Sequence, residues 1–211
     1  MTMSHTTAAA ATETSGIFAE AVGGIATIAL SIIALAGTAP EFLLAIATVV
    51  FGAALLIEGT SITTEYAMAE SFGSLGVATG GLAAVFLAGL TGIILGILAL
   101  LGIHAAVLAS AAVIVFGVAL LMNTSSMLNL FALKASGGSG FLMGSAVGAA
   151  SAQALAGVAA IVLGILSIAG NQPQSLNLVA LLVLGAAILV TGNGMSNAAI
   201  SIFSRVPRRP A

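Results

Sequence analysis

The chain has 211 residues, of which 60% are hydrophobic and only 5% charged, and its formal net charge is −2. A soluble domain carries about 25% charged residues, so this composition excludes a water-facing surface over most of the chain. The sequence has no cysteine, which excludes disulfides, thiolate metal sites and cysteine nucleophiles, and it has no basic patch large enough for nucleic acid.

Six apolar runs follow one another along the chain. Runs of about 20 apolar residues are long enough to cross a hydrocarbon core of about 30 Å. These runs are continuous and do not alternate with polar residues, so they favour helices over barrel strands. We therefore predict an all-α membrane protein with six transmembrane helices. The predicted spans are residues 16–37, 41–57, 82–102, 105–122, 146–170 and 176–190.

The flanking segments differ from the apolar core. Residues 1–15 are small and polar and are predicted to form a tail, residues 16–203 form the six-span domain, and residues 204–211 form a basic tail. With six spans, all four basic residues fall on the side of the two termini. By the positive-inside rule this side is cytoplasmic, so we predict a multi-pass protein with both termini inside. The four residues are Lys134, Arg205, Arg208 and Arg209.

The apolar runs contain an internal repeat, which bears directly on the fold. The pattern of Gly24, Gly37, Pro40 and Gly52 returns at Gly89, Gly102, Ala105 and Gly117, and again at Gly157, Gly170, Pro173 and Gly185. The copies cover about residues 16–66, 82–131 and 146–203. Each copy is predicted to be a helical hairpin, and the three hairpins are predicted to be related by a pseudo-threefold axis.

Glycines recur within the predicted helices, several of them seven residues apart. This spacing keeps small residues on one helix face, where they let backbones approach closely in a membrane. We interpret them as packing surfaces; the alternative is a narrow path lined by backbone and small side chains. The glycines concerned are Gly24, Gly52, Gly59, Gly89, Gly96, Gly117, Gly157, Gly164 and Gly185.

The repeated hairpin, with GIILGILALLGI, a short turn and then VIVFGVALLMN, resembles the tandem membrane repeat of HdeD-like acid-resistance proteins. The resemblance covers about residues 16–203. Pro40 and Pro173 match the proline that is typical of the family's turn, whereas Ala105 departs from it. The resemblance implies a bacterial inner-membrane protein of three hairpins with a role in acid tolerance. It offers no catalytic residues to carry over.

Few polar residues of the sequence are candidates for a binding or sensing role. Glu58, Asn123 and Thr191 occupy equivalent positions near the predicted cytoplasmic boundary, and Glu20 lies about one turn inside the first span. They either mark the membrane exit or form a polar cluster on the pseudo-threefold axis that binds an ion or a partner. His104 lies in the second predicted outer turn. The histidine side chain ordinarily changes its charge at about pH 6.5, so this residue is either a sensor of external acid or a solvated turn residue.

No catalytic arrangement is recognisable, and we predict neither enzyme activity nor a cofactor or metal site. We expect an HdeD-like inner-membrane protein in acid or general stress tolerance that acts through membrane structure or partner binding. Its expected partners are the lipid bilayer and other membrane proteins or further copies of the chain. The alternatives are a structural accessory subunit of a larger membrane complex and a passive channel for a small solute.

Overall fold

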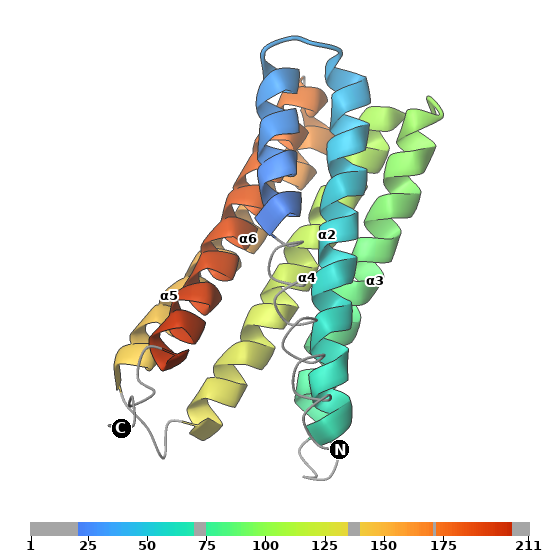
Figure 1. Ribbon diagram of the computed structural model, residues 1–211. Helices are drawn as coiled ribbons and strands as arrows, with labels where there is room; N and C mark the ends of the chain where they lie inside the picture. The colour runs from blue at the N-terminus through green and yellow to red at the C-terminus, as the bar shows by residue number, and fades with distance from the viewer. Residues whose placement is uncertain (1–20, 70–74, 135–139, 171, 204–211) are drawn as a thin grey trace, which may run out of the picture.

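The computed structural model describes residues 21–69, 75–134, 140–170 and 172–203, and in this part of the chain all regular structure is helical (Figure 1). The first helix is described over Ala21–Leu35. The five that follow are α2 (Pro40–Ala69), α3 (Leu75–Leu100), α4 (Ala105–Lys134), α5 (Gly140–Ala169) and α6 (Pro173–Phe203). Pro40 and Pro173 each open a helix, where the missing N–H of proline costs no hydrogen bond.

Helices α2 to α6 each contain a stretch that is long and apolar enough to cross a membrane, which confirms the apolar helices predicted there. The predicted first span, residues 16–37, is described only from Ala21, and its helix is apolar but shorter. The predicted tails at 1–15 and 204–211 lie outside the described residues. The five spanning stretches are Pro40–Glu58, Ala83–Leu100, Ala105–Ser125, Ala150–Ala169 and Pro173–Val190.

Three helices form the centre of the bundle. Helices α2, α4 and α6 all contact one another, whereas α3 packs against α2 and α4, and α5 packs against α4 and α6. The first helix approaches α2 at Gly23 and α6 at Gly24. The first helix, α3 and α5 therefore lie at the periphery, each beside two central helices (Figure 1).

Fully buried side chains recur along each central helix at intervals of four and three residues. This spacing keeps one face of a helix turned toward its partners. Phe51 of α2 and Phe116 of α4 meet near the middle, with ring centroids 4.8 Å apart and planes tilted by 59°. The buried positions are Leu44, Thr48, Phe51 and Leu55 in α2, Ala109, Val113, Phe116 and Leu120 in α4, and Asn177, Leu181, Leu184 and Ile188 in α6.

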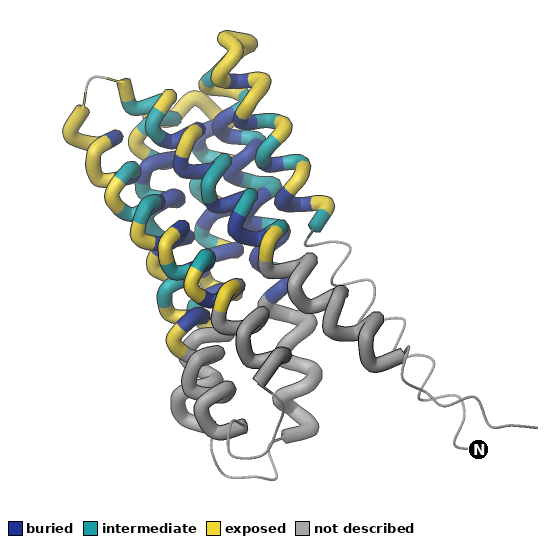
Figure 2. Tube along the Cα trace, turned by 90° about the vertical axis from the view of Figure 1, so that its left-hand side faces the viewer, coloured by how far each residue is buried: buried dark blue, intermediate teal, exposed yellow. Residues whose placement is uncertain are grey.

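The outward faces of the peripheral helices are apolar and exposed, as Figure 2 shows by the exposed positions along the outside of the tube. Large exposed patches of this kind are rare on soluble monomers. Together with the five helices that are long and apolar enough to cross a membrane, they fit contact with a lipid bilayer. Examples are Val22 and Ile25 in the first helix, Leu87 and Ile94 in α3, and Leu155 and Ile165 in α5.

Two short turns share one backbone geometry. Gly37 and Gly102 have φ values of 95° and 81°, and each donates its N–H to a carbonyl three residues earlier, at 3.0 Å in both turns. Glycine adopts this left-handed conformation without steric cost and often ends a helix in it. Two residues later, Ala39 and His104 also have positive φ, 39° and 41°.

Candidate functional site

Three helix contacts are built on facing glycines. A Cβ placed on Gly117 would lie 2.6 Å from the carbonyl oxygen of Gly157. The corresponding distances are 2.7–2.8 Å for the pair Gly52 and Gly89 and 3.0–3.1 Å for the pair Gly185 and Gly24. Each contact joins a central helix to a peripheral one. In the first two pairs the backbones are too close to leave room for a methyl group, and in the third a methyl group would make a tight contact. The pairs are Gly52 with Gly89, Gly117 with Gly157, and Gly185 with Gly24.

Glycines one heptad further along the peripheral helices face the same neighbours. A Cβ on Gly96 of α3 would lie 2.5 Å from Cγ2 of Val49, and one on Gly164 of α5 would lie 2.6 Å from Cγ1 of Ile114. The space beside these glycines is therefore filled by the adjacent helix. Gly59 belongs to α2, but its surroundings are outside the described part of the structure.

Of the four predicted polar residues, the structure brings two together. Asn123 Nδ2 of α4 donates to Oε1 of Glu58 in α2 at 3.5 Å, and both side chains are buried, with exposed fractions of 2% and 6%. Thr191 belongs to α6 and Glu20 precedes the described residues, so the surroundings of both lie outside what the structure describes.

Two further buried polar residues belong to this region of the bundle and were not predicted as site residues. Thr124 of α4 is buried next to Asn123, and its hydroxyl donates to the carbonyl of Leu120 at 2.8 Å. Gln153 of α5 is fully buried, and neither its Oε1 nor its Nε2 has a hydrogen-bond partner. In the predicted repeat Gln153 is equivalent to Glu20, and this equivalence was the sequence signal that could have identified it as a candidate site residue.

A second buried polar group lies toward the opposite ends of the helices, near the turn at 101–104. Asn177 Nδ2 of α6 donates to the Ala106 carbonyl at 3.1 Å and to Ser110 Oγ of α4 at 2.9 Å. The Ser110 and Ser167 hydroxyls lie 2.8 Å apart, and Ser167 also donates to the Pro173 carbonyl at 2.9 Å. We refer to Ser110, Ser167 and Asn177 as the Ser110 network. The sequence analysis missed it, because single Ser and Asn residues in apolar runs give little signal.

Replacing Asn177 with alanine should lower the free energy of unfolding by about 0.6 kcal/mol and at most about 1.7 kcal/mol, the range for hydrogen bonds between membrane helices. A double-mutant cycle with Ser110→Ala, read from unfolding in detergent, would isolate the coupling. Ser151→Ala is the matched control, since that exposed hydroxyl bonds only the Gly148 carbonyl of its own helix. Additive losses at Asn177 and Ser110 would contradict the prediction.

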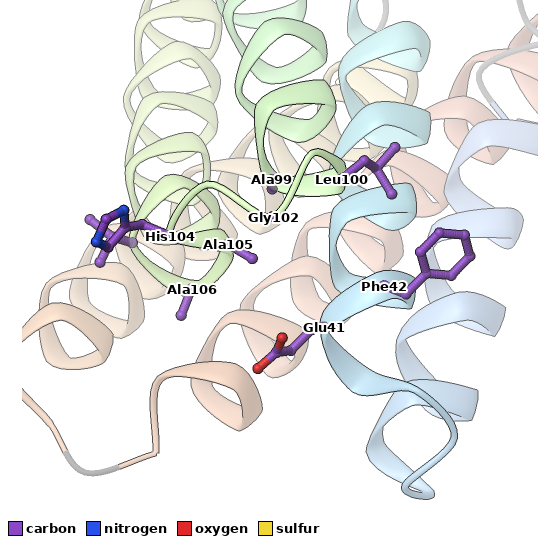
Figure 3. A pocket seen from close by; sticks show the side chains of 9 residues that line it. Glu41, Phe42, Ala99, Leu100, Gly102, His104, Ala105 and Ala106 are labelled. Atoms are coloured by element: carbon purple, nitrogen blue, oxygen red, sulfur yellow. The ribbon is translucent and has the colours of Figure 1, made fainter.

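His104 lies in the turn between α3 and α4 and is exposed. It borders a pocket of about 500 Å³ that Glu41, Phe42 and the ends of α3 and α4 also line. The Glu41 carboxylate accepts a hydrogen bond from Gln174 Nε2 of α6. Figure 3 shows the His104 imidazole directed away from the Glu41 carboxylate, so the two groups do not converge on one point in the pocket.

The described residues contain no group of three or more His, Cys, Asp or Glu side chains that could hold a metal ion. They pack as helices, and buried polar side chains of different helices are hydrogen-bonded at Glu58 and Asn123 and in the Ser110 network. Comparisons with protein-family models, curated proteins and solved structures found no match for this chain.

Proposed function

We propose that this chain is an HdeD-like integral protein of the bacterial inner membrane that serves acid or general stress tolerance. It acts through its packing in the membrane or through partner binding, and not by catalysis. The observation that carries this proposal is the filled contact between α2, α4 and α6, whose large side chains are fully buried, inside an exposed apolar surface. A bundle of this kind offers surfaces to lipid and to other helices.

We further propose that the bundle consists of three tandem hairpins related by a pseudo-threefold axis. The three glycine pairs support this, because each joins the second helix of one proposed hairpin to the first helix of the next. The last pair, Gly185 with Gly24, closes the ring. The common geometry of the turns at Gly37 and Gly102 also supports equivalence of the first two hairpins.

The proposed orientation has both termini in the cytoplasm, which puts the turns at 36–39 and 101–104 outside. It is supported by the four basic residues of the sequence, all of which fall on the proposed inner side. Cysteine is absent from the chain, so single cysteines introduced at Thr38 and at Lys134 can be labelled without background. A membrane-impermeant reagent applied to intact cells is expected to label the first and spare the second.

An acid-survival assay of a deletion strain tests the proposed function. We expect deletion to reduce survival and the wild-type chain to restore it, whereas unchanged survival would remove the acid-tolerance proposal. For His104, asparagine is the informative replacement: it tolerates the positive φ of this position but does not titrate. If His104 senses acid, the His104→Asn variant will restore less survival than the wild-type chain. Full restoration of survival by this variant would show that His104 is only a turn residue.

A structural accessory subunit is the second candidate, favoured by the extensive exposed apolar faces of the peripheral helices. Purification in mild detergent distinguishes the accessory subunit from the stress-tolerance protein, because a stoichiometric complex with a larger protein would favour the accessory role.

A passive channel is supported less, since Phe51, Phe116 and Leu184 fill the contact between the central helices. Absence of flux for small solutes in liposomes would remove it.

A further inference from the structure

Two hollows involve α3 and α4. The first is the pocket of about 500 Å³ beside His104, which we call the His104 pocket. The second is a groove of about 230 Å³ further along the two helices, which we call the α3–α4 groove. Small buried residues, Ala88 and Ala119, lie at its base, and the exposed side chains of Leu87 and Val118 lie at its edges. The other residues that line the groove are Ala84, Thr91, Ile114 and Val115.

One face of α4 joins the His104 pocket to the α3–α4 groove. Val107 lines the pocket, and Ile114 and Val118 line the groove. Together with Ala111 they follow one another at intervals of four, three and four residues, which keeps them on one side of the helix. Val107 and Val118 are eleven residues apart, or about 16 Å along the axis. The two hollows are therefore connected by an apolar strip about as long as one leaflet of the hydrocarbon core, about 15 Å.

The His104 pocket lies at one end of the stretches that are long and apolar enough to cross a membrane. The stretch of α3 ends at Leu100 and that of α4 begins at Ala105, and both residues line the pocket. All residues of the α3–α4 groove lie inside the same two stretches. A molecule that occupies both hollows therefore places one part at the boundary between water and hydrocarbon and another part within the hydrocarbon.

The lining of the His104 pocket sets the chemistry of an occupant. Figure 3 shows the Glu41 side chain extending from the start of α2 toward the start of α4, with the His104 imidazole directed away from it. The Glu41 carboxylate accepts a hydrogen bond from Gln174, whose amide is neutral and adds no charge. A carboxylate in a pocket attracts a cationic donor such as an ammonium group. The exposed apolar side chains of Phe42 and Val107 line the same pocket and favour a cation carried by a largely apolar molecule.

The α3–α4 groove suits a hydrocarbon chain. Its one polar side chain, Thr91, donates its hydroxyl hydrogen to the carbonyl of Leu87 in the same helix, at 2.7 Å. The remaining lining side chains are hydrocarbon. A polar occupant would lose its hydrogen bonds to water there without replacement, whereas an apolar chain gains packing contacts along the groove.

We propose that the His104 pocket and the α3–α4 groove together bind one membrane lipid with a primary-amine headgroup. The ammonium group lies at Glu41, and one acyl chain follows the α4 strip into the groove. A lipid fits because its charged head and its chain are joined over the length of one leaflet. A second copy of the chain would bring no cation, because none of the four basic residues lies in the five spanning stretches. This proposal does not depend on the role in acid tolerance.

Native mass spectrometry of the purified full-length chain in detergent tests the proposal. The chain is titrated with phosphatidylethanolamine, with phosphatidylglycerol of the same acyl chains, and with phosphoethanolamine, the soluble headgroup. We expect one phosphatidylethanolamine to bind about tenfold more tightly than either of the others, because only this lipid has both the ammonium group and the chain. Equal affinity for the two lipids would overturn the proposal. Binding of phosphoethanolamine as tight as that of the lipid would assign the pocket to a soluble amine and overturn it too.

Variants locate the lipid. Glu41→Gln should lower the affinity for phosphatidylethanolamine about tenfold, whereas Gln174→Ala should keep it because the carboxylate remains. Val118→Trp places a ring in the groove and should also weaken binding. Its matched control is Val162→Trp, at an exposed position of α5 outside the groove.

Unchanged binding to the folded Glu41→Gln or Val118→Trp variant would overturn the proposal. The same spectra report the oligomeric state. A dimer of the wild-type chain that Val118→Trp converts to a monomer would assign the α3–α4 groove to a second copy, which would also overturn the proposal.

Discussion

Replacing Gly117 with alanine is expected to destabilise the bundle by about 1–2 kcal/mol. The new Cβ would lie 2.6 Å from the Gly157 carbonyl oxygen and 2.8 Å from Cγ1 of Ile161. A backbone atom cannot move aside without shifting the helix, and overpacking of this kind costs about 1–3 kcal/mol. Alanine gains about 0.5–1 kcal/mol over glycine within a helix, so the steric cost outweighs the gain.

The matched control for this change is Gly148→Ala on α5. Gly148 is exposed and a Cβ there would meet nothing within 4 Å, so only the helix-propensity gain remains and stability should be unchanged or slightly higher. Gly185→Ala should fall between the two, because its Cβ would lie 3.0 Å from Cγ1 of Ile28 and 3.1 Å from the Gly24 carbonyl oxygen. Unfolding by a denaturing detergent gives the three values; equal stability of the Gly117 and Gly148 variants would contradict the packing role.

Truncating Phe116 to alanine is expected to lower the free energy of unfolding by about 3 kcal/mol, the lower end of the range for buried phenylalanines. The lower end applies because unfolded helices remain in lipid, so little hydrophobic transfer energy is lost. What is lost is the packing of a fully buried ring, including its tilted contact with Phe51. The control is Phe42→Ala, since Phe42 is 58% exposed and should matter far less.

A double-mutant cycle between Phe116 and Gly92 of α3 tests the packing of the same ring. A Cβ on Gly92 would lie 2.2 Å from Cζ of Phe116, so Gly92→Ala alone should destabilise. Phe116→Leu vacates that space, and the double variant should therefore lose less stability than the sum of the two single variants. Strict additivity, measured under the same unfolding conditions, would show that the ring and Gly92 do not share a contact.

Helix positions could be predicted because each spanning stretch is continuous and its ends carry chemical signals. Pro40, Pro173 and the turn glycines Gly37 and Gly102 mark those ends. Helix lengths were harder to predict: α2 and α4 continue to Ala69 and Lys134, well beyond their apolar stretches. Polar residues do not end a helix by themselves, so hydropathy locates the membrane boundary and not the last helical turn.

The candidate site was predictable only in part. The equivalent positions of Glu58 and Asn123 in the predicted repeat offered a polar cluster as one of two alternatives, and the structure joins these two side chains by a hydrogen bond. The partners of Asn177 and the buried state of Gln153 could not be predicted, because each depends on which residues of other helices stand opposite. An isolated Asn, Gln or Ser in an apolar run looks the same whether its side chain is buried or exposed.

The apolar composition, the continuous apolar runs and the glycine spacing of the sequence were enough to predict that the protein is helical, that it suits a membrane, and which glycines are spaced for close contact. Only the tertiary structure decided that α2, α4 and α6 form the centre and that Phe51, Phe116 and Leu184 are buried there, while Leu87, Ile94 and Ile165 are exposed. The physical reason is that lipid and a protein interior are both apolar. Helices that must satisfy both carry similar side chains on every face, so their sequences do not distinguish the buried face from the exposed one.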